Sequence, residues 1–202
     1  MENLSMTTGM VRFSYPYVFR PQANNLRPND PPTYNVDILI PKSDQATINN
    51  YNNMIGQFIT ANLQTLGSAQ GLNLPLKDGD QKGDPNYAGH WYMKLKSRFK
   101  PPIVDANMQE ILDENDFYAG CYGRANLSFY AYNNTGNRGI SVNLLALQKL
   151  QEGDRLAGTT VDVNKAFGSQ QPQGQQQPQA QPVQQNYQTQ GQQPMQPGQQ
   201  YS

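Results

Sequence analysis

Two long segments whose residues alternate between apolar and polar most constrain how this chain can fold. They are residues 117–132 (FYAGCYGRANLSFYAY) and 140–148 (ISVNLLALQ), and a stretch rich in Asn and Gly at 133–139 separates them. Period-two alternation on both sides of such a turn is typical of a β-hairpin. Three further segments also predict strands, at residues 10–19, 34–40 and 90–98.

One helix is predicted between the strands at 34–40 and 90–98. Ser43 is its candidate N-cap and Gly67 its candidate stop. Apolar residues recur between them at helical spacing, at Ile48, Tyr51, Ile55, Phe58, Ile59 and Leu63. Several strands with turn signals and a single helix predict a mainly β fold, a small closed or partly open barrel.

The C-terminal part of the chain has a different composition. From Gln170 to Ser202 nearly every residue is Gln, Pro, Gly or small and polar, and no charged side chain follows Lys165. Such a stretch buries too little apolar surface to offset the entropy lost on ordering. We therefore predict a folded domain at 1–167 and a disordered Gln/Pro/Gly-rich tail at 168–202.

Charge and cysteine content limit the classes of function. The 15 Lys and Arg balance the 15 Asp and Glu, so binding of an anion depends on local segregation of charge. Cys121 is the only cysteine, which rules out an internal disulfide and favours a reducing compartment. No signal peptide and no membrane-spanning segment is predicted.

Alternation divides residues 90–98 into two faces. We expect Trp91, Met93 and Leu95 to face the core. The opposite face then carries a Tyr beside a row of cations: His90, Tyr92, Lys94, Lys96 and Arg98.

Residues 121–132 divide in the same way. The small and apolar residues suit a barrel interior: Cys121, Gly123, Ala125, Leu127, Phe129 and Ala131. The outward set again joins aromatic rings to a guanidinium: Tyr122, Arg124, Asn126, Ser128, Tyr130 and Tyr132. Single-stranded nucleic acid offers flat bases and a phosphate chain, which aromatic rings and cations bind respectively. Because a duplex hides its bases, two such faces favour single strands.

Three blocks carry a resemblance to a known family: HWYMKLKSRFKPPIVDA (90–106), FYAGCYGRANLSFYAYN (117–133) and GISVNLLALQKLQEGDRLAG (139–158). They resemble bacteriophage single-stranded DNA-binding proteins, a family long catalogued as of unknown function and similar in fold to podovirus single-strand-binding proteins. The resemblance implies an OB-fold barrel that coats single strands without sequence specificity. It also implies a role in phage DNA replication, recombination and repair, in the cytoplasm of the infected bacterial host.

Carried to this sequence, the resemblance implies a binding face of nine residues: Tyr92, Lys94, Lys96, Arg98, Lys100, Tyr122, Arg124, Tyr130 and Tyr132. By analogy with the family we also expect a homodimer or reversible self-association. Related proteins commonly end in an acidic tail, whereas this tail has no Asp or Glu. It either tethers phage or host replication proteins, promotes self-association, as Gln-rich tracts do weakly, or is a passive solubilising segment.

Two other classes of function stay open at this point. The acidic connector at 105–116, with Asp113, Glu114 and Asp116, is where a metal-dependent nuclease would hold Mg²⁺. A virion or scaffold protein would use the outward Tyr residues to pack against other copies. Residues 78–84 lack the ligand spacing of a calcium loop and are expected to form a solvated loop. We predict no catalytic residue, no metal site and no cofactor, and we expect Cys121 to be a core thiol.

Overall fold

The computed structural model describes residues 4–25, 28–134 and 136–156, which all lie within the unit Met1–Gly158. The predicted boundary at residue 167 and the tail at 168–202 lie outside the described residues and stay predictions. In chain order the elements are β1 (Ser5–Thr7), β2 (Val11–Gln22), β3 (Thr33–Pro41), α1 (Gln45–Ala61), α2 (Leu63–Leu66), β4 (Lys77–Asp78), two 3₁₀ turns (Gly79–Gln81 and Pro85–Tyr87), β5 (His90–Ser97), β6 (Ile103–Val104), β7 (Tyr122–Asn134) and β8 (Asn137–Gln151).

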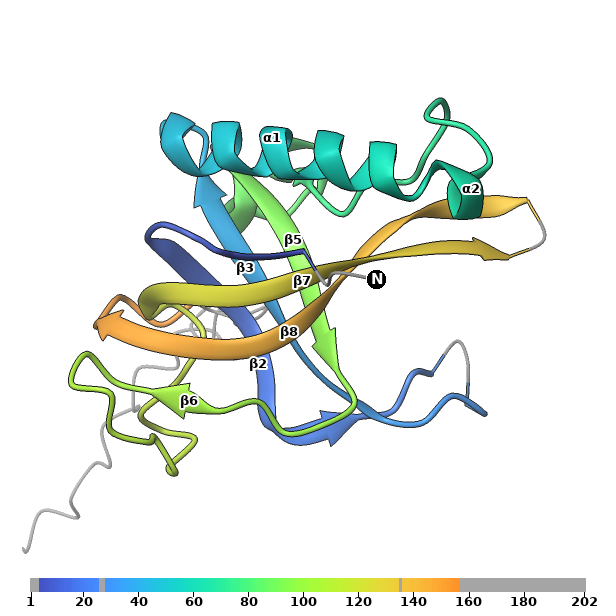
Figure 1. Cartoon of the computed structure of the whole chain (residues 1–202). Coiled ribbons are helices and arrows are strands. Elements are labelled where there is room, and N and C mark those ends of the chain that lie inside the picture. The colour runs from blue at the N-terminus through green and yellow to red at the C-terminus, as the bar shows by residue number, and fades with distance from the viewer. Residues whose placement is uncertain (1–3, 26–27, 135, 157–202) are drawn as a thin grey trace, which may run out of the picture. The chain divides into compact units, whose positions relative to one another are not determined.

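Five strands pair in a ring (Figure 1). β2 pairs with β3, β3 with β5, β5 with β8, β8 with β7, and β7 returns to β2. The predicted mainly β fold with one long helix is thus confirmed. The strands form a ring rather than an evenly hydrogen-bonded barrel, because β5 and β8 share the single register pair Lys96↔Asn143 and β7 and β2 share two pairs.

The β7–β8 hairpin is the longest pairing of the ring and extends beyond it (Figure 1). Of the residues predicted to face the interior, Cys121, just before β7, and Ala125, Leu127 and Phe129 within it are at most 2% exposed, whereas Ala131 is half-buried. Ser128, predicted to face outward, is buried as well, at 6% exposure. β7 begins at Tyr122, later than predicted, because residues 118–121 turn the chain before the strand starts.

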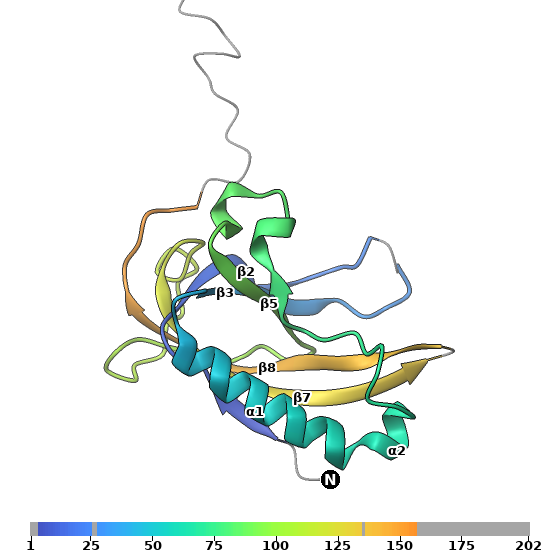
Figure 2. The same cartoon turned by 90° about the horizontal axis from the view of Figure 1, so that it is seen from above.

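Helix α1 runs alongside β7 in both views of the molecule (Figures 1 and 2). Its Tyr51 and Phe58 rings lie 6.1 and 5.8 Å from the ring of Phe129, which joins the helix to the core of the ring. The predicted N-cap, Ser43, is wrong by one residue, since the Asp44 carboxylate accepts the Thr47 N–H at 3.0 Å.

The helix also ends earlier than predicted. The backbone N–H of Asn62 donates to the carbonyls of Phe58 and Ile59, and its side-chain amide donates to Phe58 at 2.8 Å. These bonds complete the last turn of α1. Gly67, the predicted stop, ends the short helix α2 instead, with a φ of 73° that suits glycine.

The hairpin is held against α2 from one side. The Asn133 amide donates to the Thr65 carbonyl at 3.0 Å, and the Arg138 guanidinium donates to the carbonyls of Leu66 and Gln70. A bridge between Asn73 and Gly139 adds a further backbone contact. These contacts fix the hairpin at Asn133, Arg138 and Gly139, in the part that projects from the ring.

The segment at 77–89 folds over the outer face of the ring, which corrects the prediction that residues 78–84 form a solvated loop. Tyr87 is fully buried, and its hydroxyl donates to the Asp37 carboxylate at 2.7 Å. Lys82 also contacts Asp37, at 2.9 Å. Asp78 and Asp84 accept N–H groups at the starts of the two 3₁₀ turns, and Asp80 accepts the Gly89 N–H at 2.7 Å, so each of the three carboxylates holds the backbone of its own segment.

Candidate functional site

The outer face of β5 carries the row of cations that the alternation predicts. Met93 and Leu95 are fully buried, whereas Lys94 and Lys96 between them are exposed. In register, Lys96 lies opposite Asn35 of β3, which in turn lies opposite Tyr17 of β2. The outer face of three neighbouring strands therefore presents an ammonium group, an amide and an aromatic ring side by side.

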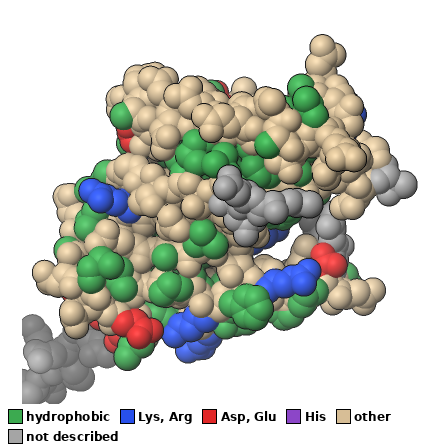
Figure 3. Space-filling view, viewed as in Figure 1, with side chains coloured by type: hydrophobic (Ala, Val, Ile, Leu, Met, Phe, Trp, Pro, Cys, Tyr) green, Lys and Arg blue, Asp and Glu red, His purple; other side chains and the backbone are tan. Residues whose placement is uncertain are grey.

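This face forms the floor of a hollow of about 690 Å³. Three parts of the chain enclose it: the outer faces of β3 and β5, the loop between β2 and β3, and the β7–β8 hairpin. Lys and Arg side chains lie beside an opening between the hairpin and the lower strands (Figure 3). The residues that line it include Tyr17, Asn35, Lys94, Lys96, Arg98, Tyr130 and Asn143.

The cations of the hollow have no acidic partner in the described chain. None of the ion pairs among the described residues includes Lys94, Lys96 or Arg98. Asp37 lies opposite Lys94 in register, but its carboxylate is only 4% exposed and binds Lys82 and Tyr87. One carboxylate, that of Asp30, also lines the hollow, so three cations against one anion leave an excess of positive charge for an anionic ligand.

Two aromatic rings accompany this charge. Tyr130 is 41% exposed and Tyr17 is 43% exposed, so each leaves a large part of its side chain to solvent within the hollow. Tyr130 comes from the hairpin and Tyr17 from β2. Flat apolar surfaces and cations thus share one concavity, which is the combination that unpaired nucleotides require.

Tyr92 shares the outer face of β5 with the cations but lies outside the hollow. Its ring meets the Tyr87 ring edge-on, with centroids 5.1 Å apart, and the Lys82 ammonium lies 4.5 Å from it. The folded segment at 77–89 therefore covers the position that the alternation left exposed.

The start of β7 also lies apart from the hollow. Tyr122 is half-buried beneath the Arg12 guanidinium, which lies 5.3 Å from its ring. Arg124 is exposed and lies opposite Gln148. Neither residue lines the hollow, so the outward residues at the two ends of β7 do not form one continuous binding surface.

The remaining two residues of the predicted face have other surroundings. Tyr132 is half-buried. Its hydroxyl lies so close to Gly139 that a side chain at that position would collide with it. The Lys100 ammonium lies 5.7 Å from the Phe19 ring. Of the nine predicted residues, the structure brings Lys94, Lys96, Arg98 and Tyr130 together, and places Tyr92, Lys100, Tyr122, Arg124 and Tyr132 outside the hollow.

Several residues of the hollow escaped the sequence analysis. Asn35 and Asn143 carried no distinguishing pattern, and Tyr17 follows a proline at which the alternation of β2 fails. Phe99 lies just beyond the hollow, between Arg98 and Lys100, and is 82% exposed. Its position between two cations was a signal available in the sequence.

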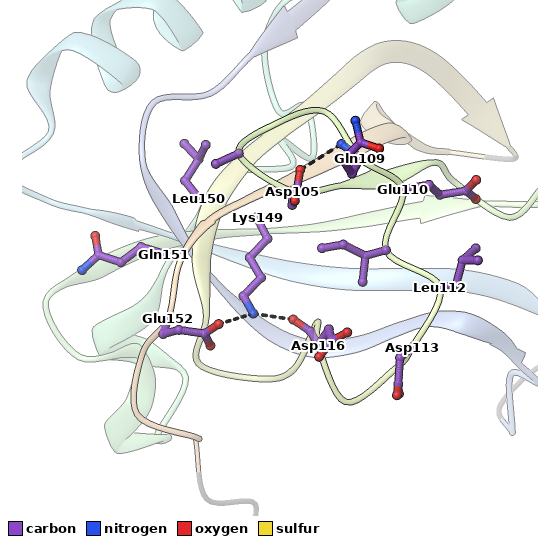
Figure 4. A pocket seen from close by; sticks show the side chains of 12 residues that line it. Asp105, Gln109, Glu110, Leu112, Asp113, Asp116, Lys149, Leu150, Gln151 and Glu152 are labelled. Atoms are coloured by element: carbon purple, nitrogen blue, oxygen red, sulfur yellow. Dashed lines mark hydrogen bonds and ion pairs between the residues drawn. The ribbon is translucent and has the colours of Figure 1, made fainter.

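The acidic connector at 105–116 forms a separate pocket of about 620 Å³ against the end of β8 (Figure 4). The Asp105 carboxylate accepts two backbone N–H groups at 2.8 Å, and Asp113 accepts the Asn115 N–H at the same distance. Lys149 donates to the Asp116 carbonyl and to Glu152, both at 2.6 Å. Asp105 and Asp113 thus act as acceptors that hold the loop, and no cluster of three metal-ligating side chains occurs within residues 4–25, 28–134 and 136–156.

Cys121 lies in the core, as predicted, and is fully buried. Burial raises the pKa of its thiol, which disfavours the thiolate that a nucleophile requires. None of the helices in the described part of the chain has the length and apolar character that crossing a bilayer requires.

Comparison with known structures gives the same fold. The chain superposes on the single-stranded DNA-binding protein from bacteriophage Enc34 in complex with ssDNA with a TM-score of 0.65, at 21% identity, over 76% of this chain and 89% of that one. It superposes on gp2.5, a single-stranded DNA-binding protein encoded by bacteriophage T7, with a TM-score of 0.57, at 16% identity, over 81% of this chain and 98% of that one.

Sequence comparison adds a curated relative and a family. Protein p50 of Acyrthosiphon pisum secondary endosymbiont phage 1 is 34% identical over 84 residues, which are 41% of this chain and 45% of that protein, so the match spans less than half of the relative. A family model described as "Enterobacter phage Enc34, ssDNA-binding protein" matches residues 4–177. The chain therefore belongs to this family of phage ssDNA-binding proteins.

Proposed function

We propose that this protein binds single-stranded DNA in the hollow between β3, β5 and the β7–β8 hairpin, without sequence preference. The observation that carries the proposal is the set of three unpaired cations, Lys94, Lys96 and Arg98, in one concavity with two exposed Tyr rings. Cations neutralise the phosphates, and the rings stack on bases of any identity. The family of the chain supports the same partner.

The position of the hollow in the fold supports the proposal independently. Oligonucleotides bind OB-folds at the face of the second and third strands, between the loop that joins strands one and two and the loop that joins strands four and five. In the ring these parts are β3 and β5, the β2–β3 loop and the β7–β8 hairpin, which enclose the hollow.

The protein acts as a binding protein rather than an enzyme in this proposal. It coats single strands during replication of phage DNA in the cytoplasm of the infected host, and the resemblance extends the role to recombination and repair. The Asp105 and Asp113 carboxylates of the connector accept hydrogen bonds within their own loop, which supports a structural role for this segment. Self-association and the tail's replication partners remain predictions, and measuring the mass in solution with and without oligonucleotide tests the first.

The experiment that tests the function compares a single-stranded oligonucleotide with a duplex of the same sequence, titrated with the full-length protein and followed by fluorescence anisotropy. We expect the single strand to bind much more tightly, because a duplex withholds its bases from the Tyr rings. Scrambling the sequence of the single strand should change its affinity little. Equal affinity for the two forms would overturn the proposal.

A further inference from the structure

Tyr15 has a backbone conformation that bulky residues rarely adopt. Its φ is +47°, and Met108 is the only other non-glycine residue in the described chain with a positive φ. A β-bulge between Ser14 and Tyr17 interrupts the pairing of β2 with β3 at this point. Because such a conformation costs free energy, its presence in a strand points to a use for the side chain it displays.

The bulge decides where Tyr15 lies. In an unbroken strand Tyr15 would follow Phe13, which is fully buried, into the interior of the ring. The extra residue instead leaves Tyr15 41% exposed and turns Tyr17 onto the outer face opposite Asn35. Two Tyr rings are thereby brought to the surface on either side of Pro16.

These residues line a pocket of about 290 Å³. Tyr15, Pro16, Tyr17, Ala119 and Leu156 make most of its wall, and no charged residue lines it. Tyr17 also lines the hollow, so its side chain borders both the pocket and the hollow. An uncharged pocket with aromatic walls suits a flat, largely apolar group and offers nothing to a phosphate.

The Tyr15 ring is held in place by the segment that covers the sheet. Its hydroxyl donates to the Asp84 carboxylate at 3.4 Å, and the Lys82 ammonium lies 5.7 Å from the ring centroid. The ring is therefore oriented before any ligand arrives, which lowers the entropy lost on binding.

We propose that the pocket of Tyr15, Pro16 and Tyr17 receives one unstacked nucleobase of the bound strand, while the phosphates follow the cations of the hollow. This inference rests on the proposed function and adds a base-binding subsite to it. Its contribution to affinity depends on the base and not on the phosphate, so it is independent of salt.

The test compares two variants on two oligonucleotides of equal length and charge, oligo(dT) and an oligonucleotide of abasic residues. Tyr15→Asn removes the ring, and Asn tolerates a positive φ, so the variant should stay folded, which its thermal unfolding curve checks. We expect it to bind oligo(dT) about tenfold or more weakly, with an unchanged salt dependence, and to bind the abasic oligonucleotide as the wild type does. Tyr15→Phe keeps the ring and should keep the affinity.

A second measurement locates the base directly. Oligo(dT) that contains 5-iodouracil, irradiated in complex with the full-length wild-type protein and analysed by mass spectrometry, should crosslink to Tyr15 or Tyr17. If the protein binds oligo(dT) but forms crosslinks only at residues other than Tyr15 and Tyr17, the subsite is refuted and the proposed function stands. The same holds if Tyr15→Asn binds oligo(dT) as tightly as the wild type. If the wild type does not bind oligo(dT), the proposed function fails and the subsite with it.

Discussion

Removing the three cations of the hollow should change how DNA binding depends on salt. The variant Lys94→Gln, Lys96→Gln, Arg98→Gln keeps most of each alkyl chain and removes only the charge. All three side chains are exposed and none has an ion-pair partner in the described chain, so the fold should not depend on them.

The size of the effect follows from the number of phosphates neutralised. Each contact to a single strand contributes about −0.7 to the slope of log K against log salt, so losing three contacts should make the slope about 2 less negative. The triple variant and the wild type should bind with similar affinity near 1 M salt. At 0.1 M salt, one decade lower, the variant should bind about 100-fold more weakly.

Fluorescence anisotropy titrations of a single-stranded oligonucleotide at four or five salt concentrations measure this slope. Arg20→Gln is the matched control, because it also removes one positive charge from an exposed side chain, one that lies 3.5 Å from Glu114 and outside the hollow. Its slope should equal that of the wild type. An unchanged slope in the triple variant, or an equal change per charge in the control, would refute the reasoning.

Three further predictions concern a ring, the core and the response to acid. Tyr130→Ala should weaken binding of single strands by about 1–3 kcal/mol, whereas Tyr130→Phe should change it little; equal affinities in the same anisotropy assay argue against stacking. Phe129→Ala should lower the free energy of unfolding in urea by about 3–5 kcal/mol, because its ring is 2% exposed beneath α1, while Leu145→Ala, at a 41% exposed site, should cost far less. The hydrogen bond from Lys42, and next that from the Gly89 N–H, lower the pKa of Asp80, so its contribution to stability is present above about pH 4 and is lost as the pH falls through the lowered pKa. The stability difference between wild type and Asp80→Asn should accordingly shrink in urea titrations at lower pH, and a difference independent of pH would contradict this assignment.

The faces of β5 and of the middle of β7 could be predicted from the sequence because they depend on one local property. Successive side chains of a strand point to opposite sides, so burial of Met93 and Leu95 implies exposure of Lys94 and Lys96 wherever the strand lies. The hairpin was predictable for the same reason, since a turn signal lay between two alternating segments.

The location of a face could not be predicted in the same way. β7 is 13 residues long and twists as it follows the ring, so the outward directions at Tyr122 and at Tyr130 differ although both residues face outward. Alternation assigns a side of the strand and not a position on the molecule. Arg124 was therefore placed on the correct face of its strand but outside the hollow.

The remaining differences between the predicted and the observed site arise from contacts between segments that are distant in sequence. Tyr92 is covered because Tyr87, from a segment without periodicity, binds Asp37, which lies 50 residues earlier in the chain. Pro16 marks where the alternation within residues 10–19 fails, but the bulge that exposes Tyr15 and Tyr17 is defined by the pairing with β3, which the sequence does not show. Both features depend on pairings that a local reading cannot detect.

The closure of the ring has a consequence for how the protein folds. β1 and β2 hydrogen-bond to β7, and Met6 pairs with Leu127 across most of the described chain. During synthesis the edges of β1 and β2 that pair with β7 therefore stay unpaired until the hairpin emerges from the ribosome. Contacts between residues so distant in sequence also slow folding. Open strand edges invite pairing with other chains, so a polysome that makes many copies at once is the place where aggregation competes most strongly with the native ring.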